Sequence, residues 1–144
     1  MFIGEYHYLL DLKRRLAIPA KFRESFRGKA VITKGLDGCL FVYPIIVWEK
    51  LAEKLGNLPL GERKTRQFVR LVLAGAIEAD MDKQGRILIP SYLAEFAQLE
   101  KDVIVIGLYD RLEIWNKDAW EGSRKEAEKE KNDVAEELGK LGIY

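Results

Sequence analysis

Apolar residues recur along this chain at two spacings, one typical of strands and one typical of helices. Alternating or continuous apolar runs of strand length occupy 6–10, 16–18, 30–33, 39–43, 77–81, 87–89, 102–106 and 111–115. Helical spacing, or a short segment directly after a proline, covers 20–26, 44–56, 61–74, 91–98 and the residues from 118 onward. Glycine-containing turns separate the third strand from the fourth and the seventh from the eighth, which predicts two hairpins. The chain is therefore predicted to have an α+β fold.

The same order of elements occurs twice, and specific residues mark the two copies. An Asp-x-x-x-Arg segment followed by Ile-Pro starts at Asp11 and returns 71 positions later at Asp82. After one inserted residue the offset becomes 72, and it relates Gly35 to Gly107, Leu36 to Leu108, Leu40 to Leu112 and Trp48 to Trp120. Matches in this order indicate a tandem duplication. The predicted organisation is a first module at 1–56, a connecting amphipathic helix at 57–75, and a second module with a C-terminal helix at 76–144.

The Asp-x-x-x-Arg segment has the composition of a tight turn. An aspartate that begins a turn can accept hydrogen bonds from its own backbone, and Gly85 supplies a residue that tolerates positive φ. Asp11, Asp82 and Gly85 are therefore predicted to shape the two turns. One interpretation is a local ion pair between the aspartate and the arginine that stabilises a hairpin. Exposed pairs of this kind contribute only about 0–1 kcal/mol, so stability alone is a weak reason to build the turn twice.

The basic residues of the turns suggest a second interpretation. A protruding two-stranded ribbon can enter the major groove of DNA, where arginine binds guanine edges or grips phosphate. The first copy offers Lys13, Arg14 and Arg15 at a single turn, and residues 10–30 hold seven basic side chains against two acidic ones. Such a density predicts a polyanion-binding surface, with a solvated charged face as the alternative.

Charge is divided unevenly between the two halves of the sequence, although the net charge is only +1. Residues 1–72 contain 14 Lys and Arg against 7 Asp and Glu, and residues 73–144 contain 10 against 16. A basic half suits a polyanionic partner, because neutralising phosphates releases counterions. The division predicts two faces with different partners, or halves that attract each other within or between chains.

Taken together, these motifs resemble the MraZ family of bacterial transcriptional regulators, in the AbrB/SpoVT-type swapped-hairpin superfamily. The resemblance covers essentially the whole chain and rests on an MF-x-G-E-Y start, LD-x-K-x-R-x-x-IPAKFR, DKQGRILIP, and GLYDRLEIW followed by Trp120. One Asp-x-x-x-Arg would be weak, but two copies with the downstream Ile-Pro and hairpin are specific. The fold that this resemblance implies is a tandem pair of swapped-hairpin β-barrel modules with flanking helices.

The resemblance also implies a function. Members of that family form ring-shaped homo-oligomers that bind direct repeats of double-stranded DNA upstream of the division and cell-wall gene cluster, chiefly as repressors. They are cytoplasmic and associated with the nucleoid. The residues to which the resemblance assigns the motif positions are Lys13, Arg15, Lys83 and Arg86 for DNA, and Asp11 and Asp82 for the turns.

One position departs from the family pattern. Arg14 stands where the family usually has glycine before the motif arginine, while the second copy keeps Gly85. A residue with a side chain is strained by roughly 1 kcal/mol or more if that position requires positive φ. Either the first turn has a different shape, or the strain is tolerated and Arg14 adds a DNA-binding charge; the first copy is in either case the better candidate for DNA contact.

Two other classes of protein are the alternatives, an enzyme and a non-catalytic interaction or assembly module. His7 is the only histidine and Cys39 the only cysteine, and Cys39 lies in the apolar run CLFVY. The sequence contains no phosphate-binding glycine loop, metal-ligand spacing or Ser/His/Asp set. We therefore expect no catalytic activity, cofactor, metal site or small-molecule substrate. No apolar run is long enough to cross a bilayer, so a cytoplasmic protein without a membrane partner is expected.

Overall fold

Eight strands form where the apolar runs predict them. They are β1 (Phe2–Leu9), β2 (Arg15–Ala17), β3 (Lys29–Lys34), β4 (Leu40–Pro44), β5 (Ile77–Asp80), β6 (Arg86–Leu88), β7 (Asp102–Tyr109) and β8 (Arg111–Asn116). The computed structural model describes residues 1–143. Six of the strands make one antiparallel sheet in the order β1-β7-β8-β4-β3-β5, and β2 pairs with β6 in a separate two-stranded ribbon. The predicted hairpins β3–β4 and β7–β8 are both present.

The two copies of the repeat exchange strands. β1 of the first copy pairs with β7 of the second, and β5 of the second pairs with β3 of the first. β4 and β8 meet at the centre of the sheet, and β2 meets β6. The α+β fold with tandem duplicated modules is thus confirmed, and the copies are related by an approximate twofold. Two details differ: β1 and β2 are not a hairpin within one copy, and the sheet is open, with β1 and β5 at its edges, rather than closed into a barrel.

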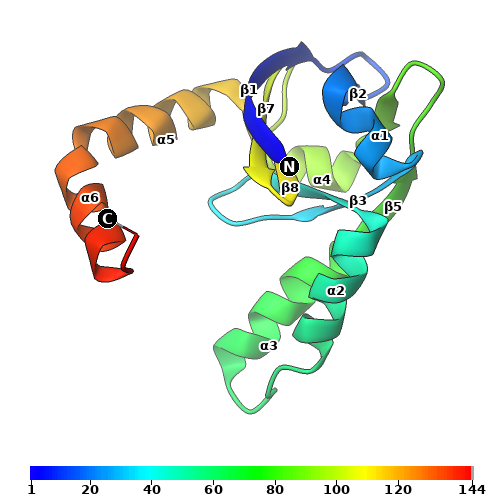
Figure 1. Cartoon of the computed structure of the whole chain (residues 1–144). Coiled ribbons are helices and arrows are strands. Elements are labelled where there is room, and N and C mark those ends of the chain that lie inside the picture. The colour runs from blue at the N-terminus through cyan, green and yellow to red at the C-terminus, as the bar shows by residue number, and fades with distance from the viewer. Residues whose placement is uncertain (144) are drawn as a thin grey trace.

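Helices fill the segments between the strands. They are η1 (Ala20–Phe22), α1 (Arg23–Phe26), α2 (Ile45–Gly56), α3 (Arg63–Val69), η2 (a π-helical segment, Arg70–Ala74), α4 (Ser91–Phe96), α5 (Lys117–Lys129) and α6 (Lys131–Lys140). Prolines stand directly before η1, α2 and α4, as expected for the first turn of a helix. The pair α2 and α3 and the arm formed by α5 and α6 both extend away from the sheet (Figure 1). No helix within residues 1–143 is long and apolar enough to cross a membrane.

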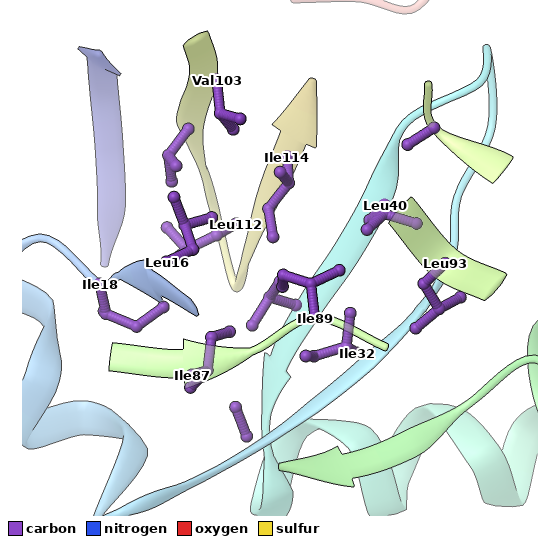
Figure 2. Packing of buried hydrophobic residues seen from close by; sticks show 14 of the residues in the cluster. Leu16, Ile18, Ile32, Leu40, Ile87, Ile89, Leu93, Val103, Leu112 and Ile114 are labelled. Carbon is purple, nitrogen blue, oxygen red and sulfur yellow. The ribbon is translucent and has the colours of Figure 1, made fainter. Parts of the chain in front are cut away.

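The main core lies between the ribbon and one face of the large sheet. Strand alternation turns Leu16 and Ile87 inward, and both are fully buried. Ile18 and Ile89, directly after the two ribbon strands, are buried beside them. Figure 2 shows these four side chains meeting residues of the large sheet and of α4, namely Ile32, Leu40, Leu93, Val103, Leu112 and Ile114. The ribbon is therefore held by its inner face, and its outer face is left to solvent.

The opposite face of the sheet carries a second, smaller core that repeats the tryptophan of each copy. The ring of Trp48 on α2 lies 5.9 Å from that of Tyr43. At positions 72 residues later, the ring of Trp120 on α5 lies 5.4 Å from that of Trp115. In both copies the first turns of the helix thus pack on an aromatic residue one position before the end of the preceding strand.

Candidate nucleic-acid interface

The ribbon brings the two Asp-x-x-x-Arg turns, 71 residues apart in sequence, to one place. In its register Arg15 lies opposite Leu88, Leu16 opposite Ile87, and Ala17 opposite Arg86. Because Leu16 and Ile87 point inward, alternation places Arg15 and Arg86 on the outer face. The structure therefore joins the two motif arginines in one surface that contains both copies.

Each turn is organised by its aspartate. In the first copy, Oδ1 of Asp11 accepts hydrogen bonds from the backbone N–H of Lys13 at 2.9 Å and of Arg15 at 2.8 Å. Its Oδ2 accepts one from Nε of Arg15 at 2.7 Å. In the second copy, Asp82 accepts the equivalent bonds from the N–H of Gln84, the N–H of Arg86 and Nε of Arg86, at 2.9, 2.9 and 2.8 Å. The spacing of four residues is what lets one carboxylate shape the turn and hold the arginine.

These hydrogen bonds favour the charged form of both aspartates. The backbone N–H of Arg15 is the largest influence that lowers the pKa of Asp11, and that of Arg86 plays the same part for Asp82. The two turns are also linked to each other, because Nη1 of Arg86 lies 3.8 Å from Oδ2 of Asp11. Within the described residues, the side-chain hydrogen bonds of both arginines run through Nε, and Nη1 of Arg86 faces Asp11 as well.

Arg14 occupies the same backbone conformation as Gly85. The φ of Arg14 is 60° and that of Gly85 is 77°, and each N–H donates to the carbonyl of its turn aspartate at 2.9 Å. The first turn therefore has the same shape as the second, and a left-handed conformation is accepted at a residue with a side chain, at a cost of roughly 1–2 kcal/mol. The side chain of Arg14 is half-buried, and its Nε donates to the carbonyl of Ile89 at 3.0 Å.

Several basic side chains of the run at 10–30 have partners within the protein. Nε of Arg23 donates to the carbonyl of Ile18 at 2.9 Å, and Nζ of Lys21 lies 5.1 Å from the centre of the Tyr6 ring. Lys29 lies 3.6 Å from Glu78 in an ion pair on neighbouring strands. The two halves of the sequence are interleaved in the fold, because the copies exchange strands and share the ribbon.

Leu12 and Gln84 also lie at the tips of the turns, although the pattern of charged residues did not indicate them. The 71-residue offset equates Leu12 with Lys83 and Lys13 with Gln84, so the tips read Leu-Lys and Lys-Gln. All four are exposed, and Leu12 is completely so, at 103%. An exposed leucine can contact a thymine methyl group, and glutamine can pair with adenine. A residue-by-residue alignment of the two copies identifies these positions, because each uncharged tip residue is equivalent to a lysine in the other copy.

His7 and Cys39 are not brought together. His7 lies on β1 and Cys39 directly before β4, with β7 and β8 between those strands. Nε2 of His7 lies 3.0 Å from Oδ1 of Asp102 at the surface. Cys39 is buried, and burial raises the pKa of its thiol well above the usual range, which disfavours the nucleophilic thiolate. Among residues 1–143, no group of three or more His, Cys, Asp or Glu side chains is arranged to hold a metal ion.

Exchanged strands and paired turns define the class of this protein, a duplicated swapped-hairpin fold in one chain. The family model described as "MraZ protein, putative antitoxin-like" matches it twice, at residues 1–71 and 72–140. A protein of Caldanaerobacter subterraneus named transcriptional regulator MraZ is 50% identical over 143 residues, which are 99% of this chain and all of that protein. Proteins of the same name from Clostridium acetobutylicum and Pediococcus pentosaceus are 48% and 47% identical over the same share of each chain. The chain belongs to the MraZ family.

Proposed function

We propose that this chain is a sequence-specific DNA-binding regulator of transcription, and that the outer face of the ribbon contacts double-stranded DNA. The observation that carries the proposal is the union of two basic turns in one exposed, rigidly supported ribbon. A two-stranded ribbon has the width of the major groove. The names of the relatives, transcriptional regulator MraZ, support the same conclusion.

Four basic side chains form the proposed DNA contact, namely Arg15 and Lys13 from the first turn and Arg86 and Lys83 from the second. The terminal nitrogens of the arginines have the fork geometry that suits guanine or phosphate. Lysines at the tips suit phosphate, which supplies affinity without sequence preference. Because Asp11 and Asp82 already hold Nε of each arginine, little side-chain freedom is lost on binding.

The arrangement also favours action as an oligomer. Both turns belong to one ribbon, so one chain offers one DNA contact, and several direct repeats require several chains. A ring-shaped homo-oligomer would bind such repeats by avidity. An open groove of about 760 Å³ suits self-association, since the exposed side chains of Met1, Ile46 and Tyr109 line it together with Arg27.

The finer role that we propose is repression of the division and cell-wall gene cluster, without catalysis, in the cytoplasm and at the nucleoid. The second candidate is an assembly module that does not bind DNA. The observation that favours it is the projecting arm of α5 and α6, which packs on the sheet through its first turns, is nearly all exposed from residue 124 onward and has no role in the ribbon.

A binding titration separates the two candidates. DNA from upstream of the chain's own gene is titrated with wild type, Arg15→Ala and Arg86→Ala at two salt concentrations. Each substitution is expected to weaken binding by about 1–3 kcal/mol, or roughly 5- to 150-fold, and to reduce the salt dependence if the lost contact is to phosphate. Lys64→Ala is the matched control, because Lys64 is an exposed basic residue on α3, at the far end of the molecule from β2 (Figure 1). Absence of a specific complex at low salt would reject DNA binding in favour of the assembly module.

A further inference from the structure

Two arginines near the ribbon are directed at backbone carbonyls rather than at solvent. We propose that Arg14 and Arg23 are positioning residues, which hold the two turns in their relative positions instead of contacting DNA themselves. This inference rests on the proposed function only for its effect on DNA affinity, since its structural part concerns the protein alone. It gives Arg14 a different role from the DNA contact that its charge and place in the turn suggest.

Arg23 joins helix α1 of the first copy to the turn of the second. Its Nε donates to the carbonyl of Ile18 at 2.9 Å, and the N–H of Ile18 donates to the carbonyl of Gly85 at 2.9 Å. The guanidinium lies directly over Gly85, where an added Cβ would come within 2.2 Å of Nε. Glycine is therefore favoured at position 85 for two reasons, its φ of 77° and the space that it leaves for Arg23, whose side chain would otherwise have to shift.

The equivalent carbonyl in the second copy, that of Ile89, also accepts a hydrogen bond from an arginine Nε, but this arginine is Arg14 of the first turn. The N–H of Ile89 donates to the carbonyl of Arg14 at 2.8 Å, and Nε of Arg14 donates back to the carbonyl of Ile89 at 3.0 Å. Under the 71-residue repeat, Ile89 corresponds to Ile18, Arg14 to Gly85, and the buried Ala94 to Arg23. Around Ile18 the helix therefore supplies an arginine, Arg23, and the turn a glycine, Gly85. Around Ile89 the helix supplies an alanine and the turn an arginine.

This exchange explains why arginine is present at a left-handed position. The carbonyls of Ile18 and Ile89, which follow the two ribbon strands, each need a donor, because a part-buried carbonyl without a partner is costly. With Ala94 on the helix, the first turn must supply that donor itself, and Arg14 does so with φ at 60°. Nε of Arg14 bonds across the two copies, whereas Arg23 bonds within the first copy and packs its guanidinium over Gly85 of the second. Each arginine thereby fixes one turn against the other copy.

Substitutions of equal length test the positioning role. In glutamine the side-chain N–H₂ stands as many bonds from Cα as Nε does in arginine, whereas methionine has similar length and no donor. We expect Arg14→Gln to keep the unfolding midpoint and the DNA affinity within about twofold of wild type, with an unchanged salt slope. Arg14→Met is expected to lower the midpoint by roughly 2–6 °C and the affinity by roughly 3- to 10-fold. The pair Arg23→Gln and Arg23→Met is expected to behave in the same way.

A transposition gives an independent test. Arg14→Gly combined with Ala94→Arg places glycine in the turn and arginine on the helix, as Gly85 and Arg23 already are, and it is expected to recover the midpoint that Arg14→Gly alone loses. Equal losses for Arg14→Gln and Arg14→Met, with a salt slope lowered by about one, would instead identify Arg14 as a phosphate contact and overturn the proposal. So would an Arg14→Met variant with wild-type midpoint and affinity. If wild type binds no DNA, the proposed function fails, but the midpoints still decide whether these arginines hold the turns.

Discussion

Removing the side chain of Ile87 tests whether the exchanged copies are one folding unit. Ile87 lies on the inner face of the ribbon with 0% exposure, and it packs in the cluster that also contains Leu16 of the other copy. Ile→Ala substitutions at such sites cost about 2–5 kcal/mol, because the lost transfer energy is increased by the cavity that remains. At about 3 kcal/mol, a chain of this size is expected to lose roughly 10 °C of its unfolding midpoint.

Hydrogen exchange shows which strands lose stability in Ile87→Ala. Four of the six strand pairings join the two copies, so opening one copy removes the partners of the other. We therefore expect the slowest amide protons of β3 and of β7 to lose the same protection in Ile87→Ala, about 150-fold for 3 kcal/mol. Leu88→Ala is the matched control, since Leu88 follows on the same strand with 51% exposure and its loss should change stability by less than about 0.5 kcal/mol.

The same hydrogen-exchange experiment shows whether the two modules fold independently. We propose that the boundaries 1–56, 57–75 and 76–144 describe the duplication and not independently folding domains. Two unfolding transitions in Ile87→Ala, or β3 and β4 retaining wild-type protection while β7 and β8 lose it, would refute this reasoning. Each module would then fold on its own, and the strand exchange would contribute little to stability.

Three further predictions concern charge and the projecting arm. The lowered pKa values of Asp11 and Asp82 contribute stability that is fully present above the unfolded pKa of about 3.9 and is lost as pH falls through the folded pKa; Asp82→Asn should therefore flatten the acid limb of a plot of unfolding midpoint against pH. An Asp82→Asn curve parallel to wild type would contradict this. Truncation after Lys129 removes α6, whose residues are nearly all exposed, and should leave the unfolding midpoint within a few degrees of wild type by calorimetry; a much larger drop would mean that the arm is part of the core. Arg111→Ala removes the 3.0 Å ion pair of the buried Glu113 carboxylate and leaves it only the hydrogen bond from the indole N–H of Trp115, also at 3.0 Å. The free energy of unfolding, measured by denaturant titration, should fall by about 1.5–3 kcal/mol, and Glu113→Gln should largely restore it.

Local features of this fold follow from the sequence because neighbouring residues determine them. The turn at Asp82 forms from hydrogen bonds within five residues, and the hairpins need only glycine and two apolar runs. The duplication is visible as well, since Trp48 and Trp120 stand at matching positions on matching helices. These features sufficed to predict the α+β class and the elements.

Partners far apart in sequence could not be predicted in the same way. Alternating strands such as β1 can pair with any strand of suitable length, and only long-range packing selects β7 rather than β2. The roles of the basic residues depend on that choice. Arg14 and Arg23 look like neighbours in one charged run, yet Arg14 donates to the carbonyl of Ile89, 75 residues away, which only the folded ribbon brings near. Arg23 donates to the nearby Ile18 but packs over Gly85 of the other copy.

Hydrogen exchange with and without saturating DNA from upstream of the gene shows whether both turns contact DNA together as one ribbon. We expect the amides of 11–15 and of 82–86 to gain protection at the same DNA concentration, while those of the basic helix α3 do not change. Protection at only one turn, or at α3 with both turns unaffected, would contradict it.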